Sequence, residues 1–141
     1  MIHSNGPCDL HTELPATLAA VEDFVLGFRR RTQPVLPRED HFAIELLLRE
    51  LLCNAVVHGC RKDPDKRIRC AVRQRRQRLT LVVCDGGSGF DWRAAWRQSS
   101  GASDCSGRGM EILRAYATQV RFNKTGNQAV IVRQLSTGES Q

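Results

Sequence analysis

The chain has 141 residues, of which 41% are hydrophobic and 26% are charged, and its formal net charge is +6. This length suits one domain with a hydrophobic core and is too short for two ordinary ones, so we treat residues 1–141 as a single domain with loose ends at 1–7 and 136–141. No apolar run approaches the ~20 residues needed to span a bilayer, and no signal peptide is visible, so we expect a cytoplasmic protein without membrane contact.

The cysteines and the basic residues are two sets of side chains that could form a site. The six cysteines form no C-x-x-C pair and have no regular histidine companion, which disfavours a zinc site. Nine of the 21 basic residues lie between Arg61 and Arg78. Such a cluster can bind nucleic acid or an acidic protein, but no aromatic residue interleaves with it, so we favour a hairpin with a solvated basic face.

The hydrophobic pattern predicts a strand, two helices, a hairpin, a loop, a third helix and a closing hairpin. We therefore expect an α+β fold, a two-layer sandwich whose mixed, mainly antiparallel sheet carries the helices on one face. The predicted elements are a strand at 8–14, a helix from Pro15 to Arg31, a helix from Arg38 to about His58 that stops at Gly59, strands at 68–74 and 79–85, a loop at 91–106, a helix at 107–117 and a hairpin at 119–135.

Three polar residues recur at helical spacing in "ELLCNAVVHG", the segment from Glu50 to Gly59. Glu50, Asn54 and His58 are four residues apart and therefore lie along one face of the predicted helix. The other side chains are mostly apolar, so the helix is expected to be largely buried, and polar groups buried without partners cost about 1–3 kcal/mol each. This polar stripe indicates either a ligand cleft or a structural hydrogen-bond network.

Two glycine-rich segments follow downstream. "DGGSG", from Asp85 to Gly89, comes directly after a predicted strand, where glycines allow close approach to a ligand but also form ordinary turns. "GRGMEIL" places Gly107 and Gly109 at the start of a helix, whose free N–H groups and positive dipole end attract anions. Each segment alone is weak evidence for a binding site.

Together the three segments resemble the Bergerat-type ATP-binding fold of the GHKL superfamily, which includes gyrase, large chaperones, histidine kinases and mismatch-repair ATPases. The resemblance covers nearly the whole chain. The short length and the form of the first segment are most similar to the anti-sigma-factor serine/threonine kinases of bacterial partner-switching systems. A sensor histidine kinase carries a phospho-accepting helical hairpin ahead of this domain, and about 30 residues do not supply one.

The resemblance implies a role for each matching residue. Asn54 would ligate Mg²⁺, a hard cation that amide oxygens suit, within the nucleotide site. Glu50 would act as the catalytic residue by polarising an attacking serine hydroxyl or water, or would instead hold the helix motif in a network. Asp85 would accept a hydrogen bond from the adenine amino group, and Gly87 and Gly89 would let the chain pass close to the base.

The remaining assignments concern the phosphates and the supporting residues. Gly107 and Gly109 match the phosphate-binding turn, and Arg108 between them would reach a phosphate or point to solvent. Residues 91–106 match the lid over the nucleotide, and His58 is expected to support the site. Many family members also have a Gly-Thr pair in the closing hairpin, where this chain reads Gly126-Asn127-Gln128, a difference that affects selectivity more than ATP binding.

These assignments predict an ATP- and Mg²⁺-dependent protein serine/threonine kinase. It would bind a sigma factor or an equivalent regulatory protein and phosphorylate an anti-sigma-factor antagonist, with no direct nucleic-acid contact, and the resemblance is compatible with a homodimer. One alternative is a non-catalytic module whose nucleotide state controls partner binding. Another is a small nucleic-acid-binding protein that uses the basic residues from Arg61 to Arg78.

Overall fold

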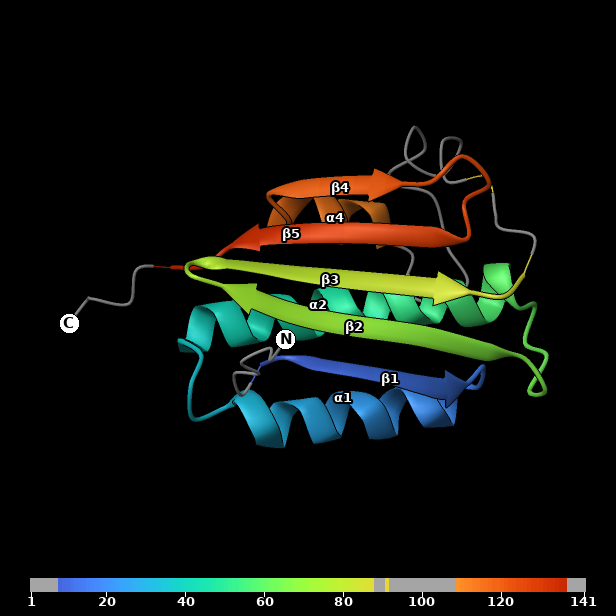
Figure 1. Ribbon diagram of the computed structural model, residues 1–141, viewed down its shortest axis with the longest axis horizontal. Helices are drawn as coiled ribbons and strands as arrows, with labels where there is room; N and C mark the ends of the chain where they lie inside the picture. The colour runs from blue at the N-terminus through green and yellow to red at the C-terminus, as the bar shows by residue number, and fades with distance from the viewer. Residues whose placement is uncertain (1–7, 88–90, 92–108, 137–141) are drawn as a thin grey trace, which may run out of the picture.

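The structure, a computed structural model, describes residues 8–87, 91 and 109–136. Its strands form one five-stranded antiparallel sheet in the order β1-β2-β3-β5-β4, and the helices α1, α2 and α4 lie on one face of that sheet (Figure 1). This confirms the predicted α+β fold class. The elements are β1 (Leu10–Pro15), α1 (Leu18–Thr32), α2 (Arg38–Asn54), the π-helical turn η1 (Ala55–Gly59), β2 (Arg67–Arg75), β3 (Arg78–Asp85), α4 (Gly109–Tyr116), β4 (Gln119–Phe122) and β5 (Gln128–Gln134).

The start of α1 differs from the prediction that Pro15 opens the helix. Pro15 is instead the last residue of β1, where it pairs with Arg67 of β2. Thr17 has an extended backbone and caps the helix, because its side-chain oxygen accepts a hydrogen bond of 3.1 Å from the amide of Ala20. A side-chain cap thus overrides the preference of proline for the first helical turn.

The second helix begins at Arg38, as predicted, but its α-helical part ends at Asn54. The next five residues form η1, in which the amide of Cys60 bonds to the carbonyl of Ala55 at 2.7 Å. A π-turn has wider hydrogen-bond spacing than an α-helix, and such turns are frequent at functional sites. The regular α-helix therefore gives way to a π-turn just after Asn54, and the helical segment ends at Gly59, the predicted stop.

The hydrophobic core lies between the helices and the inner face of the sheet. Side chains of β2 and β3 alternate between buried and more exposed positions, as expected for a sheet covered on one side. The core includes Phe28, Leu47, Leu81, Leu113 and Ile131, which come from five different elements. None of the described helices has an apolar stretch long enough to bridge a bilayer.

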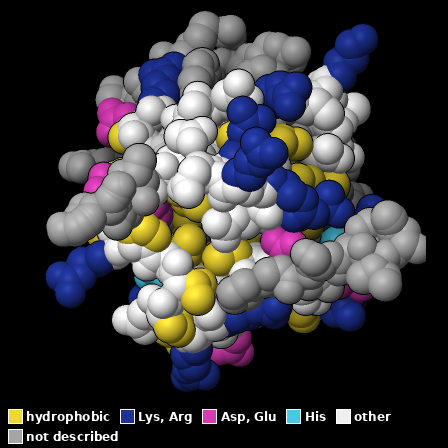
Figure 2. Space-filling model, turned by 60° about the vertical axis from the view of Figure 1, so that its left-hand side comes forward, with side chains coloured by type: hydrophobic (Ala, Val, Ile, Leu, Met, Phe, Trp, Pro, Cys, Tyr) yellow, Lys and Arg dark blue, Asp and Glu magenta, His cyan; other side chains and the backbone are white. Residues whose placement is uncertain are grey.

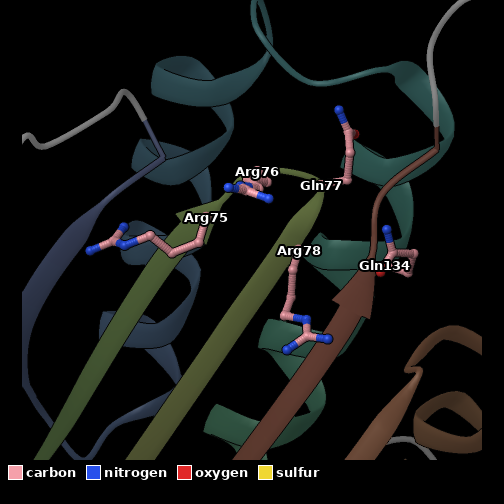
Figure 3. A pocket seen from close by; sticks show the side chains of 5 residues that line it. All are labelled: Arg75, Arg76, Gln77, Arg78 and Gln134. Carbon is pink, nitrogen blue, oxygen red and sulfur yellow. The ribbon is translucent and has the colours of Figure 1, made fainter.

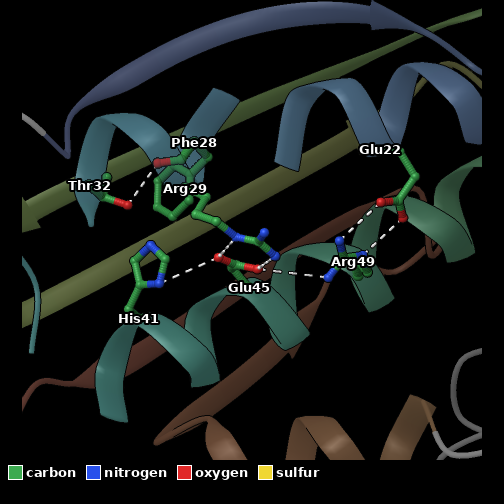
Figure 4. A network of polar contacts seen from close by, with 7 residues as sticks. All are labelled: Glu22, Phe28, Arg29, Thr32, His41, Glu45 and Arg49. Atoms are coloured by element: carbon green, nitrogen blue, oxygen red, sulfur yellow. Dashed lines mark hydrogen bonds and ion pairs between the residues drawn. The ribbon is translucent and has the colours of Figure 1, made fainter. Parts of the chain in front are cut away.

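An ionic network joins α1 to α2 (Figure 4). Arg29 donates two hydrogen bonds of 2.8 Å to the two carboxylate oxygens of Glu45, a bidentate arrangement that is among the stronger ion-pair geometries. His41 lies 3.4 Å from the same carboxylate, and Arg49 links Glu45 to Glu22. The two helices are therefore fixed in register by charge as well as by packing.

A second buried carboxylate ties the start of α2 to the end of the sheet. Asp40 is fully buried and accepts hydrogen bonds from Arg133 of β5 and from both the amide and the hydroxyl of Ser136. Arg133 also donates to the carbonyl of Tyr116 at the end of α4. One ion pair thereby holds α2, α4 and β5 together at the end of the molecule where the β2–β3 turn also lies (Figure 1).

Candidate functional site

The structure brings Glu50 and Asn54 together at the start of α4. Glu50 is only 6% exposed, and a Cβ atom on Gly109 would lie 2.6 Å from its Oε1 and 4.0 Å from Nδ2 of Asn54. Gly109 is the first described residue of α4, so backbone amides without intrahelical partners and the positive end of the helix dipole lie beside these two side chains. The arrangement combines an acid, an amide oxygen and an anion-attracting helix end.

A second group of residues joins the end of β3 to the π-turn. A Cβ atom on Gly59 would collide with the carboxylate of Asp85, and one on Gly87 would collide with the carbonyl oxygen of Gly59. The amide of Gly87 also donates a hydrogen bond of 2.8 Å to Oδ1 of Asp85. Two glycines therefore permit the contact between η1 and the chain after β3, and this contact fixes the Asp85 carboxylate in place.

The surroundings of Asp85 disfavour its charged form. Burial raises the pKa of the Asp85 carboxyl above its ordinary value of 3.8, while the hydrogen bond from Gly87 and the charge of Lys66 act in the opposite direction. A carboxylate with incomplete solvation has acceptor capacity for a ligand that supplies hydrogen-bond donors. This chemistry suits recognition of an exocyclic amino group.

Asp85 and Asn54 line the same small cavity, which brings residues from α2, β3 and the β4–β5 hairpin together. Its volume is about 20 Å³, enough for a water molecule, so a nucleotide base can enter only if the walls separate. The apolar part of the lining provides a surface against which a flat ring can pack. The lining residues are Leu51, Asn54, Ala55, Val83, Asp85, Phe122, Gly126, Asn127, Gln128 and Ala129.

The β4–β5 turn contacts this site through Asn127, which stands in this chain at the place of the Gly-Thr pair of many family members. The amide of Asp85 donates to the carbonyl of Asn127 at 3.0 Å, and Nδ2 of Asn127 lies 3.4 Å from the carbonyl oxygen of Gly87. Oδ1 of Asn123 accepts the amides of three successive residues, 126 to 128, and so shapes the turn. The asparagine pair was the available sequence signal, because asparagine side chains commonly bond to backbone in turns.

Gly59, which the sequence predicts only as the residue that ends the helix, has a second role in the structure. Its absent side chain matters because Asp85 occupies that space, a contact between residues 26 positions apart in the chain. No local pattern in the sequence indicates a contact between residues so far apart. His58, the third residue of the polar stripe, is half-buried on η1, whereas Asn54 is the last residue of α2.

The residues present suit a nucleotide and a divalent cation. The absence of a side chain at position 109 lets the start of α4 approach the Glu50 carboxylate closely, and Asn54 supplies an oxygen ligand of the kind that Mg²⁺ accepts. Within 8–87, 91 and 109–136 no three His, Cys, Asp or Glu side chains cluster as a metal site. Gly89, Gly107, Arg108 and all of the predicted lid at 91–106 except Asp91 lie outside the described residues.

Comparison with known proteins agrees with this geometry. The chain matches the histidine kinase-like ATPase domain over residues 12–133, and it therefore belongs to that family. Membership of this family supports ATP binding and, at a coarse level, phosphotransfer chemistry. No curated protein sequence matches the chain.

Two solved structures of histidine kinases share the fold. The histidine kinase domain of the blue-light activated histidine kinase from Erythrobacter litoralis EL346 superimposes with a TM-score of 0.54 at 15% identity, over 86% of this chain and 60% of that chain. The mycobacterial sensor histidine kinase MprB superimposes with a TM-score of 0.52 at 17% identity, over 89% of this chain and 98% of that one. The chain thus spans 60% of the length of the first of these structures. At these identities, the two comparisons show that the fold is shared.

Proposed function

We propose that this chain is an ATP- and Mg²⁺-dependent protein serine/threonine kinase that acts as a partner-switching regulator. It would bind a sigma factor or an equivalent regulatory protein and phosphorylate the antagonist of that regulator. The observation that carries this proposal is the position of Glu50, a buried carboxylate beside both Asn54 and the first residue of α4. A module that only binds nucleotide has no need of an acid at this place.

The chain's own residues supply the parts that phosphotransfer requires. Bound Mg²⁺ would neutralise charge on the phosphates, and Asn54 is the residue suited to hold it. The start of α4 would bind the phosphates through its free amides, and Asp85 would orient the base through its carboxylate. Glu50 would then accept the proton of a serine hydroxyl, and its buried location limits competition from water.

The proposal is tested by separating phosphotransfer from nucleotide binding. We expect Glu50→Gln to lower the rate of label transfer from γ-labelled ATP to a candidate antagonist at least about 100-fold, while calorimetric ATP affinity stays within about threefold of wild type. Glu39→Gln is the matched control, because Glu39 is an exposed glutamate in the first turn of the same helix. It should change neither quantity.

The alternative function predicts a different result from the same experiment. If wild-type protein binds ATP and transfers no label to any serine or threonine substrate, the chain is a non-catalytic module whose nucleotide state controls partner binding. If Glu50→Gln abolishes ATP binding together with transfer, the catalytic assignment of Glu50 is wrong and the residue supports the helix motif instead.

A further inference from the structure

An open hollow lies at the tip of the β2–β3 hairpin, at the end of β3 opposite Asp85. It has a volume of about 530 Å³ and is lined by Arg75, Arg76, Gln77, Arg78 and Gln134 (Figure 3). β3 runs from Arg78 to Asp85, so at 3.3 Å per residue the hollow is roughly 23 Å from the candidate nucleotide site. The hollow is therefore a separate feature of the molecule.

Most of the positive charge in this hollow is not neutralised by the protein. Arg75 points toward β1, where its Nη1 lies 3.2 Å from the carboxylate of Asp9 (Figure 3). Arg76 and Arg78 are exposed, and neither has an acidic partner within the described part of the chain. Two guanidinium groups, each with several donors in a planar fork, are thus available to an external carboxylate.

The backbone at Arg76 is strained in a way that points to a role for its side chain. Arg76 has a φ of 58°, which lies in the left-handed region, and it is the first residue of the two-residue turn between β2 and β3. Glycine is the residue that such hairpin positions favour. The turn instead carries an arginine at the mouth of the hollow, and strain of this kind is common where a side chain is required for binding.

The face of the sheet that carries no helix has an apolar row that crosses β3 four residues along from Arg78. Outward-facing Ala71, Val82 and Val130 lie in register across β2, β3 and β5 and are partly exposed. Arg69 and Arg73 flank this apolar row along β2. Figure 2, which views the hairpin end obliquely, shows Lys and Arg side chains gathered next to exposed hydrophobic ones.

We propose that the arginine hollow and the apolar row farther along the same strands form a docking surface for an acidic, amphipathic segment of a partner protein. Its carboxylates would pair with Arg76 and Arg78, and its apolar side chains would cover Val82 and Val130. Nucleic acid fits this surface less well, because β2 and β3 contain no aromatic residue for base stacking and a phosphate backbone gains nothing from an apolar row. The surface goes beyond the proposed kinase function and does not depend on it.

The test measures binding of a fluorescein-labelled peptide of alternating glutamate and leucine by fluorescence anisotropy. We expect Arg78→Glu to weaken binding at least about tenfold and Arg76→Gly to weaken it about threefold. Arg30→Glu is the matched control, since it makes the same charge change at an exposed arginine on α1 without an ionic partner in the residues described. It should leave the affinity within about twofold of wild type.

Folding and the nucleotide site are controlled separately. Arg76→Gly relieves backbone strain, so its melting temperature should equal or exceed that of wild type, and lost binding cannot then reflect unfolding. Asp85→Ala should leave peptide binding unchanged, which separates failure of this proposal from failure of the kinase proposal. Absence of peptide binding, tighter binding of a thymidine oligonucleotide than of the peptide, or equal weakening by Arg30→Glu would each overturn the docking surface.

Discussion

At the scale of single residues, two glycines determine how closely the end of β3 approaches the π-turn. Gly59 leaves room for the carboxylate of Asp85, and Gly87 leaves room for the carbonyl of Gly59. Both contacts involve groups with little freedom to move, a backbone carbonyl in one case and a hydrogen-bonded carboxylate in the other. The position of Asp85 therefore depends on the absence of two side chains.

Substitution of Gly87 tests this dependence. We expect Gly87→Ala to lower the free energy of unfolding by about 1–3 kcal/mol, because a methyl group forces the β3 end and η1 apart. The control is Gly27→Ala on α1, where a Cβ atom would meet nothing within 4 Å. That change should instead stabilise the protein by about 0.5–1 kcal/mol, through the helix propensity of alanine. Urea denaturation of both variants measures the difference, and equal effects would contradict the proposed contact.

Substitution of Asp85 has a pH-dependent consequence. Because burial raises the pKa of Asp85, the folded state holds this proton more tightly than the unfolded state, and ionisation costs stability as the pH rises through that pKa. Asp85→Asn keeps an oxygen acceptor for the Gly87 amide and removes the charge. We expect the variant to match or exceed wild-type stability at pH 7, by at most about 1 kcal/mol, with the advantage disappearing as the pH falls below 3.8. Denaturation of the variant and of wild type across this pH range measures the difference in their stability.

At the scale of elements, the contact between α1 and α2 depends on ionisation in the opposite direction. The hydrogen bonds from Arg29, together with its charge, lower the pKa of Glu45 below its ordinary value of 4.5. The stability that this carboxylate contributes is therefore present at neutral pH and is lost as the pH falls through the lowered pKa. Ionisation of Glu45 therefore increases the stability of the fold as the pH rises, whereas ionisation of Asp85 decreases it.

The variant Glu45→Gln isolates the contribution of the ionic network. We expect it to lower the free energy of unfolding by about 1–2 kcal/mol at pH 7, since the bidentate pair with Arg29 is only partly exposed to solvent. The deficit relative to wild type should shrink as the pH drops below 4.5. Glu13→Gln is a suitable control, because its pair with Arg67 is 3.7 Å long and exposed on both sides. A deficit that persists unchanged at low pH would show that packing, and not charge, is lost.

At the scale of the whole molecule, the candidate site is assembled from α2, η1, β3, α4 and the β4–β5 turn. A ligand that binds across these elements stabilises the folded state as a unit. The cavity between them is smaller than a nucleotide base, so binding requires local separation of its walls. Nucleotide binding and global stability should therefore be coupled in this protein.

Thermal denaturation with nucleotide measures that coupling. With ATP and Mg²⁺ at about 100 times the dissociation constant, we expect about 2.7 kcal/mol of stabilisation, which raises the melting temperature by several degrees. Chelation of Mg²⁺ should reduce the shift, and Asp85→Ala should abolish most of it. A comparable shift with GTP would show that Asp85 does not select the base.

The sequence by itself determined the order and type of the elements, and it selected the candidate residues of the site. The alternation of apolar and polar residues in β2 and β3, the helical spacing in α2 and the glycines at the start of α4 are local patterns. Such patterns can be recognised without knowledge of the rest of the chain. Glu50 and Asn54 could be selected in this way because buried polar groups at helical spacing need partners. Pro15 was placed wrongly in the first helical turn, and the π-turn that follows Asn54 was not predicted, because a side-chain cap and a π-turn involve only a few hydrogen bonds.

Only the tertiary structure decided which of these residues meet. The placement of β5 between β3 and β4, the interlock of Gly59 with Asp85, and the contact of Asn127 with Gly87 all join distant parts of the chain. The arginine hollow likewise requires Gln134 of β5 to lie beside the β2–β3 turn. Such contacts depend on strand order and packing, and no repeating pattern in the sequence indicates either of them. The sequence therefore predicted the components of the candidate site, and the fold determined how they are arranged.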